Sequence, residues 1–184
     1  MPRLTGVSKD SVEGDLRAAL DKQVKRYGAA LYNHTVLARR PGIFRGFRAM
    51  WDGLEDQALL PARLVDLINL KVAALIGCGL CIEINSAVSK ADGVSDDELA
   101  ALPAYAESAY FTERERAALA YADTITIDST VPDELYQRVR RSFSDDEIVE
   151  LTATVVWEIA AAKFNRALEI ESQGICLLAA RTLP

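Results

Sequence analysis

The chain has 184 residues, half of them hydrophobic, so it is long enough to bury a core within one domain. Its 21 basic and 27 acidic residues give a formal net charge of −6, and Lys and Arg form no block longer than a short pair such as Arg39-Arg40. A phosphate backbone would find little electrostatic support on such a chain, so nucleic acid is not expected as a partner.

The sequence shows neither a signal peptide at its N-terminus nor an apolar run of transmembrane length. The N-terminal segment has no apolar stretch of the signal-peptide kind, and the longest uncharged run, residues 72–82, is too short to cross a bilayer. Three cysteines do not make a disulfide framework in a chain of this length. We therefore expect a cytoplasmic protein with no membrane partner.

Apolar residues recur at three- and four-residue spacing between sparse glycines and prolines, which predicts an all-α protein. No linker long enough to separate two domains is visible, so residues 1–184 are expected to form a single domain. In chain order, the predicted helices are residues 9–32, 42–56, 61–76, 79–91, 96–102, 112–127, 132–142 and 145–171.

Three of these helix starts carry a capping box. In this motif the N-cap hydroxyl accepts a hydrogen bond from a first-turn backbone N–H, and a carboxylate three residues later accepts one from the backbone N–H of the N-cap residue. The boxes are Ser95–Glu98, Thr112–Glu115 and Ser144–Glu147. The segment 124–127, "TITI", has the composition of a strand, but the helical pattern before it favours a helix end.

Two apolar helical stretches align at an offset of 84 residues, "RLVDLINLKVAALIGC" with "EIVELTATVVWEIAAA". In this alignment Asp66 faces Glu150, and Cys78 faces Ala162. An internal helical repeat is one interpretation. Chance similarity between two amphipathic helices is the other.

The stretch "IGCGLCIEIN" at residues 76–85 contains two cysteines three residues apart. On a helix Cys78, Cys81 and Asn85 share a face, while Glu83 points to another side. A helix that begins near Gly77 would place these thiols at the positive end of its macrodipole, which favours the thiolate, the nucleophilic form.

Two other interpretations of the pair stay open at this point. Free cysteines are often buried, so the pair could serve core packing alone. A zinc site would need four ligands, and the remaining candidates, Cys176 and His34, are isolated in the sequence. No metal and no cofactor are therefore expected.

Three segments together resemble the carboxymuconolactone decarboxylase superfamily, and within it the alkylhydroperoxidase D-like branch. They are "LPARLVDLINLKVAALIGCGLCIEINSAVSKADGVSDDEL", "YFTERERAALAYADTIT" and "FSDDEIVELTATVVWEIAAAKFNRAL", and the resemblance covers about residues 30–175. The signature of the branch is an acidic residue, eleven residues, Cys-x-x-Cys, three residues and His. Here the same spacing is occupied by Asp66, Cys78, Cys81 and Asn85.

The resemblance implies a thiol peroxidase for organic hydroperoxides. Cys81 would attack the peroxide as a thiolate, and Cys78 would resolve the resulting sulfenic acid into a disulfide. An external dithiol or a thioredoxin-like protein would then reduce the disulfide. The resemblance also implies a homo-oligomer, a dimer, trimer or hexamer.

This sequence departs from the family pattern at Asn85, because an amide cannot carry a proton near neutral pH. Asp66, aided by Glu83 or a water molecule, would then do the proton transfer alone, or the peroxidase activity would be attenuated. For Glu83 itself, an exposed helix carboxylate is the favoured interpretation. His34, in the polar stretch "YNHTVLARR", is expected to be solvated or to cap a helix, and Cys176 to be a partly buried bystander.

Two alternative functions remain beside the peroxidase. One is a lactone decarboxylase, the reaction that names the superfamily, although a chain with one histidine offers few bases. The other is a non-catalytic helical assembly protein that inherited the fold and the dithiol.

Overall fold

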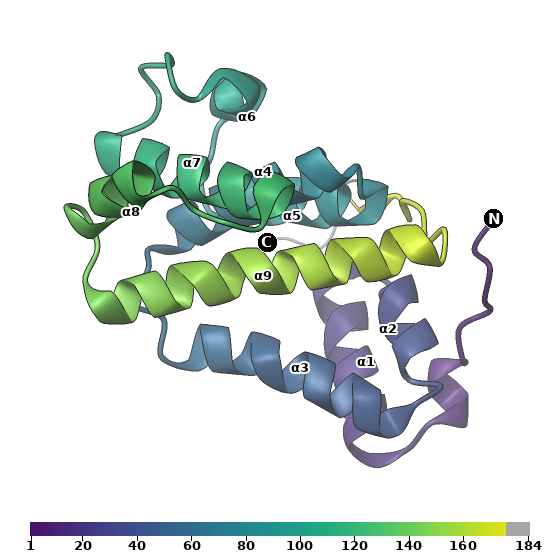
Figure 1. Cartoon of the computed structure of the whole chain (residues 1–184). Coiled ribbons are helices and arrows are strands. Elements are labelled where there is room, and N and C mark those ends of the chain that lie inside the picture. The colour runs from purple at the N-terminus through teal and green to yellow at the C-terminus, as the bar shows by residue number, and fades with distance from the viewer. Residues whose placement is uncertain (176–184) are drawn as a thin grey trace.

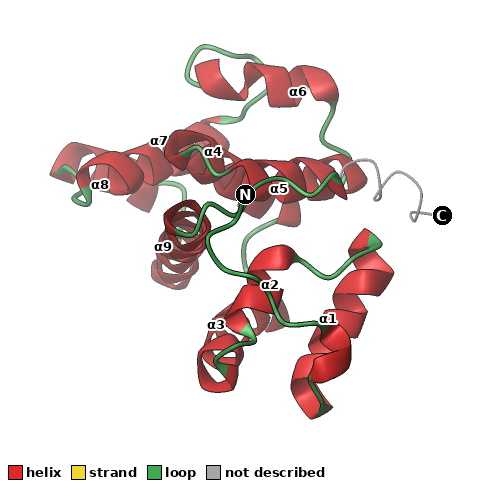
Figure 2. Cartoon of the chain, turned by 90° about the vertical axis from the view of Figure 1, so that its right-hand side faces the viewer, coloured by secondary structure: helices red, strands yellow, loops and turns green. Residues whose placement is uncertain are grey.

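A computed structural model describes residues 1–175, and every regular element in that part of the chain is a helix (Figures 1 and 2). The elements are the short 3₁₀ helix η1 (Lys9–Ser11), α1 (Gly14–Tyr27), α2 (Tyr32–Leu37), α3 (Pro41–Asp56), α4 (Ala62–Ile76), α5 (Gly79–Ala91), α6 (Asp96–Ala101), η2 (Leu102–Ala104), α7 (Glu113–Asp128), α8 (Asp133–Arg140) and α9 (Asp145–Ala167). The all-α prediction is confirmed.

Helix α9 runs through the middle of the molecule, between two groups of helices (Figure 1). On one side lie α4, α5, α7 and α8, with α6 beyond them, and on the other side lie α1, α2 and α3 (Figures 1 and 2). Helix α9 contacts α3, α4, α5, α7 and α8, so it contributes side chains to both groups.

The larger core cluster forms where α4 and α9 pack. Ile68 and Val72 of α4 are fully buried against Leu151 and Val155 of α9. In each helix these residues are four positions apart, so they form one stripe on the helix surface. The stripe predicted from the periodicity is therefore the surface that joins the two helices.

The predicted helix 9–32 is wrong as one element, because the chain breaks it into η1, α1 and α2. Helix α1 ends at Gly28, which has the left-handed φ of 77° that a glycine adopts without steric cost. The side chain of Gln23 then accepts the backbone N–H of Leu31 at 2.9 Å, which replaces a helical bond.

The predicted last helix also extended too far, since α9 ends at Ala167 rather than at 171. The N–H of Ile170 turns back to the carbonyl of Asn165 at 2.9 Å, and Glu169 has a φ of 51°. All three predicted capping boxes are present, at Ser95, Thr112 and Ser144. Residues 124–127 lie inside α7, as expected.

The two segments of the proposed repeat are both helices, α4 and α9, and they pack against each other. Shared origin is not tested by that contact, so the repeat stays a prediction, as does the extent of the domain. No helix among residues 1–175 combines the length and apolar character needed to span a bilayer.

Gly77 ends α4 with a left-handed φ of 71° directly before the first cysteine of the pair. A Cβ at this position would meet nothing within 4 Å, so substitution is opposed by the backbone conformation alone. We expect Gly77→Ala to lower the free energy of unfolding by roughly 1 kcal/mol. Gly53→Ala, in helical α3 and also with open space around the new Cβ, is the matched control and should raise it. Urea titration of both variants measures the difference, and equal effects would contradict the expectation.

Candidate functional site

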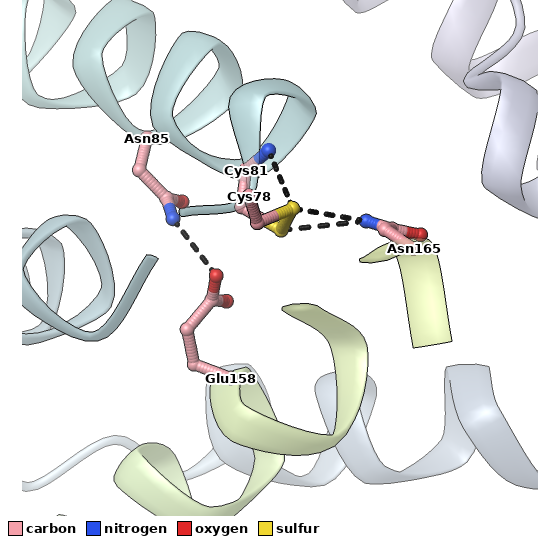
Figure 3. Close-up of a disulfide and its surroundings, with 5 residues drawn as sticks. All are labelled: Cys78, Cys81, Asn85, Glu158 and Asn165. Carbon is pink, nitrogen blue, oxygen red and sulfur yellow. Dashed lines mark hydrogen bonds between the residues drawn. A yellow bond between two sulfur atoms is a disulfide. The ribbon is translucent and has the colours of Figure 1, made fainter. Parts of the chain in front are cut away.

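The cysteine pair lies at the start of α5, where Cys78 is the N-cap residue. Its sulfur accepts the backbone N–H of Cys81 at 3.2 Å, and the two cysteines form a disulfide (Figure 3). Cys78 is fully buried, whereas Cys81 keeps 6% of its surface exposed. The first-turn amides of a helix favour negative charge, so this position stabilises a thiolate once the disulfide is reduced.

Helix α9 supplies a second hydrogen-bond donor to the sulfurs. Nδ2 of Asn165 lies 3.3 Å from the sulfur of Cys81 and 3.5 Å from that of Cys78 (Figure 3). Asn165 is 1% exposed, so these bonds form away from water. A donor in a dry site favours a charged sulfur acceptor more strongly than it would in solvent.

One helical turn after Cys81, Nδ2 of Asn85 donates to Oε1 of Glu158 on α9 at 3.2 Å (Figure 3). Glu158 is only 3% exposed. Burial raises the pKa of Glu158 to about 8, and the hydrogen bond from Asn85 offsets part of that effect. Glu158 is therefore mainly protonated near neutral pH and can donate a proton.

Several of these groups line a cavity of about 880 Å³, whose other lining residues come from α1, α2, α3 and α4 as well as α5 and α9. Cys81, Asn85, Glu158 and Asn165 contribute to its lining, and Cys78 does not. Of the two cysteines in the pair, Cys81 is therefore the one that a ligand in the cavity can reach.

Asp66 also lines this cavity, and it is 8% exposed. Burial and the neighbouring carboxylate of Asp92 raise the pKa of Asp66 to about 7. The side-chain amide of Asn85 donates to Glu158 on α9 rather than to Asp66 on α4.

Glu83, like Cys78, is a sequence candidate that lies outside the cavity lining. Its carboxylate accepts the backbone N–H groups of Gln173 and Ile175, at 2.7 and 2.6 Å. It is half-buried rather than the exposed helix carboxylate that the sequence favoured. Glu83 therefore holds the segment that follows α9 against α5.

The expectation for His34 is wrong, because its side chain is 4% exposed and lines the cavity. Its ring contacts Phe44 and Phe47 edge-on, and Nδ1 pairs with the Gln23 side-chain amide. Burial lowers the pKa of His34 to about 3, so it is neutral and a poor proton acceptor at physiological pH. Cys176 lies outside the described residues.

Sequence reasoning missed Glu158 and Asn165. The signal for Glu158 was present, because it is the one carboxylate in the otherwise uncharged run "LTATVVWEIAAA". A charge on the apolar stripe of a helix is either buried at a cost or functional. Asn165 is uncharged, so its side chain gave no comparable indication of a buried functional group.

The sequence profile of the carboxymuconolactone decarboxylase family matches residues 41–124. Among curated proteins, the uncharacterized protein YnjA of Escherichia coli is 32% identical over 111 residues. That alignment covers 60% of this chain and 61% of YnjA, so the similarity spans less than two thirds of the relative.

Solved structures show the same fold. ATU0492 from Agrobacterium tumefaciens, a protein of unknown function described as a candidate antioxidant defence protein AhpD, is 25% identical with a TM-score of 0.70, over 74% of this chain and 94% of that chain. An uncharacterized peroxidase-related protein from Ralstonia eutropha with an alkylhydroperoxidase AhpD core is 18% identical with a TM-score of 0.86. The match covers 100% of this chain and 97% of that chain. The debrominase Bmp8 is 17% identical with a TM-score of 0.84, and the match covers 97% of this chain and 96% of that chain.

The raised pKa of Glu158 predicts a pH dependence of stability. An unfolded glutamate loses its proton around pH 4.5, whereas the folded protein keeps this proton up to about pH 8. Stability from this group is therefore full below pH 4.5 and falls as the pH rises towards 8. Glu158→Gln should remove this slope and stabilise the protein at pH 8 by on the order of a few kcal/mol.

Chemical denaturation of the disulfide form across this pH range measures the effect. The matched control is Glu107→Gln, at an exposed position, and it should leave the slope unchanged. A Glu158→Gln variant that kept the native slope, or lost stability at pH 8, would contradict the assignment.

Proposed function

Because this chain belongs to the carboxymuconolactone decarboxylase family, in its alkylhydroperoxidase D-like branch, we propose that it is a dithiol peroxidase for organic hydroperoxides. The observation that carries the proposal is that Cys81 faces a cavity which also holds the buried acid Glu158. The nucleophile Cys81 and the proton donor Glu158 thus line the same cavity, which offers space for a substrate.

In the first step the thiolate of Cys81 attacks one oxygen of the peroxide, and the O–O bond breaks. Cys81 becomes a sulfenic acid, and the departing alkoxide takes a proton from Glu158 to leave as an alcohol. The amides of α5 and Nδ2 of Asn165 stabilise the attacking thiolate.

In the second step the sulfur of Cys78 attacks the sulfur of Cys81 and expels the hydroxyl group as water, which forms the observed disulfide. The net change consumes two thiols and one hydroperoxide and gives a disulfide, an alcohol and water. An external dithiol or a thioredoxin-like protein must then supply two electrons and two protons to restore the thiols.

The arrangement gives Asn85 a role that its chemistry permits. An amide cannot relay a proton, but it can hold a carboxyl group in place through a hydrogen bond. We assign the proton transfer to Glu158 and the orientation of its carboxyl group to Asn85. In this proposal the lack of a histidine at position 85 does not attenuate the activity, because Glu158 of α9 supplies the proton.

The proposal includes a cytoplasmic location, where reductants keep such pairs recharged, and a homo-oligomeric state. Exposed apolar side chains on α9 support the homo-oligomeric state. Val149 and Val156 lie seven residues apart, on one face of the helix, and are 70% and 49% exposed.

The alternatives from the sequence are a lactone decarboxylase and a non-catalytic assembly protein. His34, with a pKa of about 3, gives no support to a histidine base for decarboxylation. A purely structural protein has no need of the buried acid beside Cys81, which destabilises the fold at neutral pH. The similarity to a debrominase is one of fold.

Substitution of each cysteine tests the roles of the pair. Cys81→Ser should abolish hydroperoxide consumption, because the cavity-facing nucleophile is lost. Cys78→Ser should permit one attack per chain and leave a sulfenic acid at Cys81, which dimedone traps and mass spectrometry locates. The opposite pattern would show that the roles are inverted, and turnover by Cys81→Ser would overturn the proposal.

Glu158→Gln tests the proton donor. General acid catalysis typically contributes ~10²- to 10⁴-fold, so the rate of Cys81 oxidation should fall by at least roughly tenfold. In the native protein the rate should decline as the pH rises through about 8, where Glu158 loses its proton, and this decline should be missing from the variant. Stopped-flow oxidation of the reduced protein by cumene hydroperoxide measures both effects.

Glu107→Gln is again the control and should match the native rate profile. A Glu158→Gln rate within twofold of native across the profile would remove Glu158 from the mechanism.

A further inference from the structure

Helices α4 and α9, which contribute to the lining of the cavity, carry buried hydrogen-bond acceptors without partners. Oδ1 of Asn69, Oδ1 of Asn165 and Oδ2 of Asp66 are buried, and none has a hydrogen-bond partner within residues 1–175. The three residues are 6%, 1% and 8% exposed, and all line the cavity. Buried acceptors of this kind cost free energy unless water or a ligand supplies donors.

The facing wall is aromatic. Phe44, Phe47 and Trp51 of α3 line the same cavity, and α3 lies on the other side of α9 from α4 (Figure 2). The ring of Phe47 packs against Trp157 of α9 with centroids 4.7 Å apart. An aromatic wall opposite an acceptor wall suits a flat ligand with an apolar face and a polar edge.

The charge of the interior points to a neutral ligand. Asp66 and Glu158, two buried acids of the cavity wall, both have pKa values raised by burial, so neither is a permanent counter-ion for a cation. The acceptors of Asn69 and Asn165 are uncharged amide oxygens. An ammonium group would lose its hydration at these buried acceptors without a permanent counter-charge, so neutral O–H or N–H groups are the favoured donors.

We propose that the substrates are aromatic hydroperoxides with a ring-borne O–H or N–H group, held between the acceptors of Asn69 and Asn165 and the aromatic wall of α3. This substrate class rests on the peroxidase function proposed above. An unbranched alkyl hydroperoxide fills the apolar part of the cavity but leaves the acceptors unpaired. A site with unpaired polar groups discriminates against such an analogue more strongly than an apolar pocket does.

Binding to the disulfide form tests this inference without any peroxide chemistry. The probes are 2-naphthol and 2-methoxynaphthalene, which share a ring system and differ in whether the oxygen carries a donor hydrogen. Isothermal titration calorimetry should show that 2-naphthol binds at least roughly tenfold more tightly. Equal affinities, or tighter binding of the methyl ether, would overturn the inference.

Asn69→Leu removes the amide acceptor and keeps the branching and the number of side-chain heavy atoms. It should weaken 2-naphthol binding by about tenfold and leave 2-methoxynaphthalene within about twofold of native. Gln137→Leu, at an exposed position of α8, is the control and should change neither affinity. An unchanged preference in a folded Asn69→Leu protein would overturn the role of Asn69, and if that variant does not fold, the two probes on the native chain decide.

The two proposals fail in different ways. A chain that prefers 2-naphthol but consumes no hydroperoxide would refute the peroxidase and keep the ligand class as a binding property. A chain that consumes cumene hydroperoxide but binds both probes equally would keep the peroxidase and refute the ligand class.

Discussion

The packing of α9 against α4 and α5 is the constraint on which the site depends. The cysteine pair and its position at the N-terminus of α5 come from one short segment, but the groups that complete the candidate site come from more than 70 residues further along the chain. Asn165 reaches both sulfurs and Glu158 reaches Asn85 because α9 passes directly beside the start of α5 (Figure 3). A shift of α9 by one turn would separate all three contacts.

The same packing explains why the site costs stability. The stripe of α9 that buries Leu151 and Val155 against α4 continues towards Glu158, where an apolar side chain would pack without a penalty. A carboxyl group there must stay protonated, and unpaired oxygens of Asn69 and Asn165 add to the unfavourable polar burial. Sites that bind and react commonly carry such a cost, which the surrounding core offsets.

Much of the fold was predictable because its signals are local. Capping boxes at Ser95, Thr112 and Ser144 need only four residues each, and the apolar period of α4 and α9 needs only one helix. The break after Tyr27 has a local signal in Gly28, but the Gln23 side chain that replaces a helical bond at Leu31 could not be predicted from the spacing. The cysteine pair with Asn85 was likewise visible locally, whereas the partner of Asn85 and the burial of His34 depend on how distant helices meet.

The protonation of Glu158 is the central claim, and infrared difference spectroscopy measures it most directly. With glutamate labelled by ¹³C, the disulfide form should show a shifted carboxylic-acid carbonyl band near neutral pH. The band should disappear as the pH rises through about 8 and be missing from Glu158→Gln. A native spectrum without this band near neutral pH would mean that Glu158 is a carboxylate, which would contradict its proposed role as the proton donor to the leaving alkoxide.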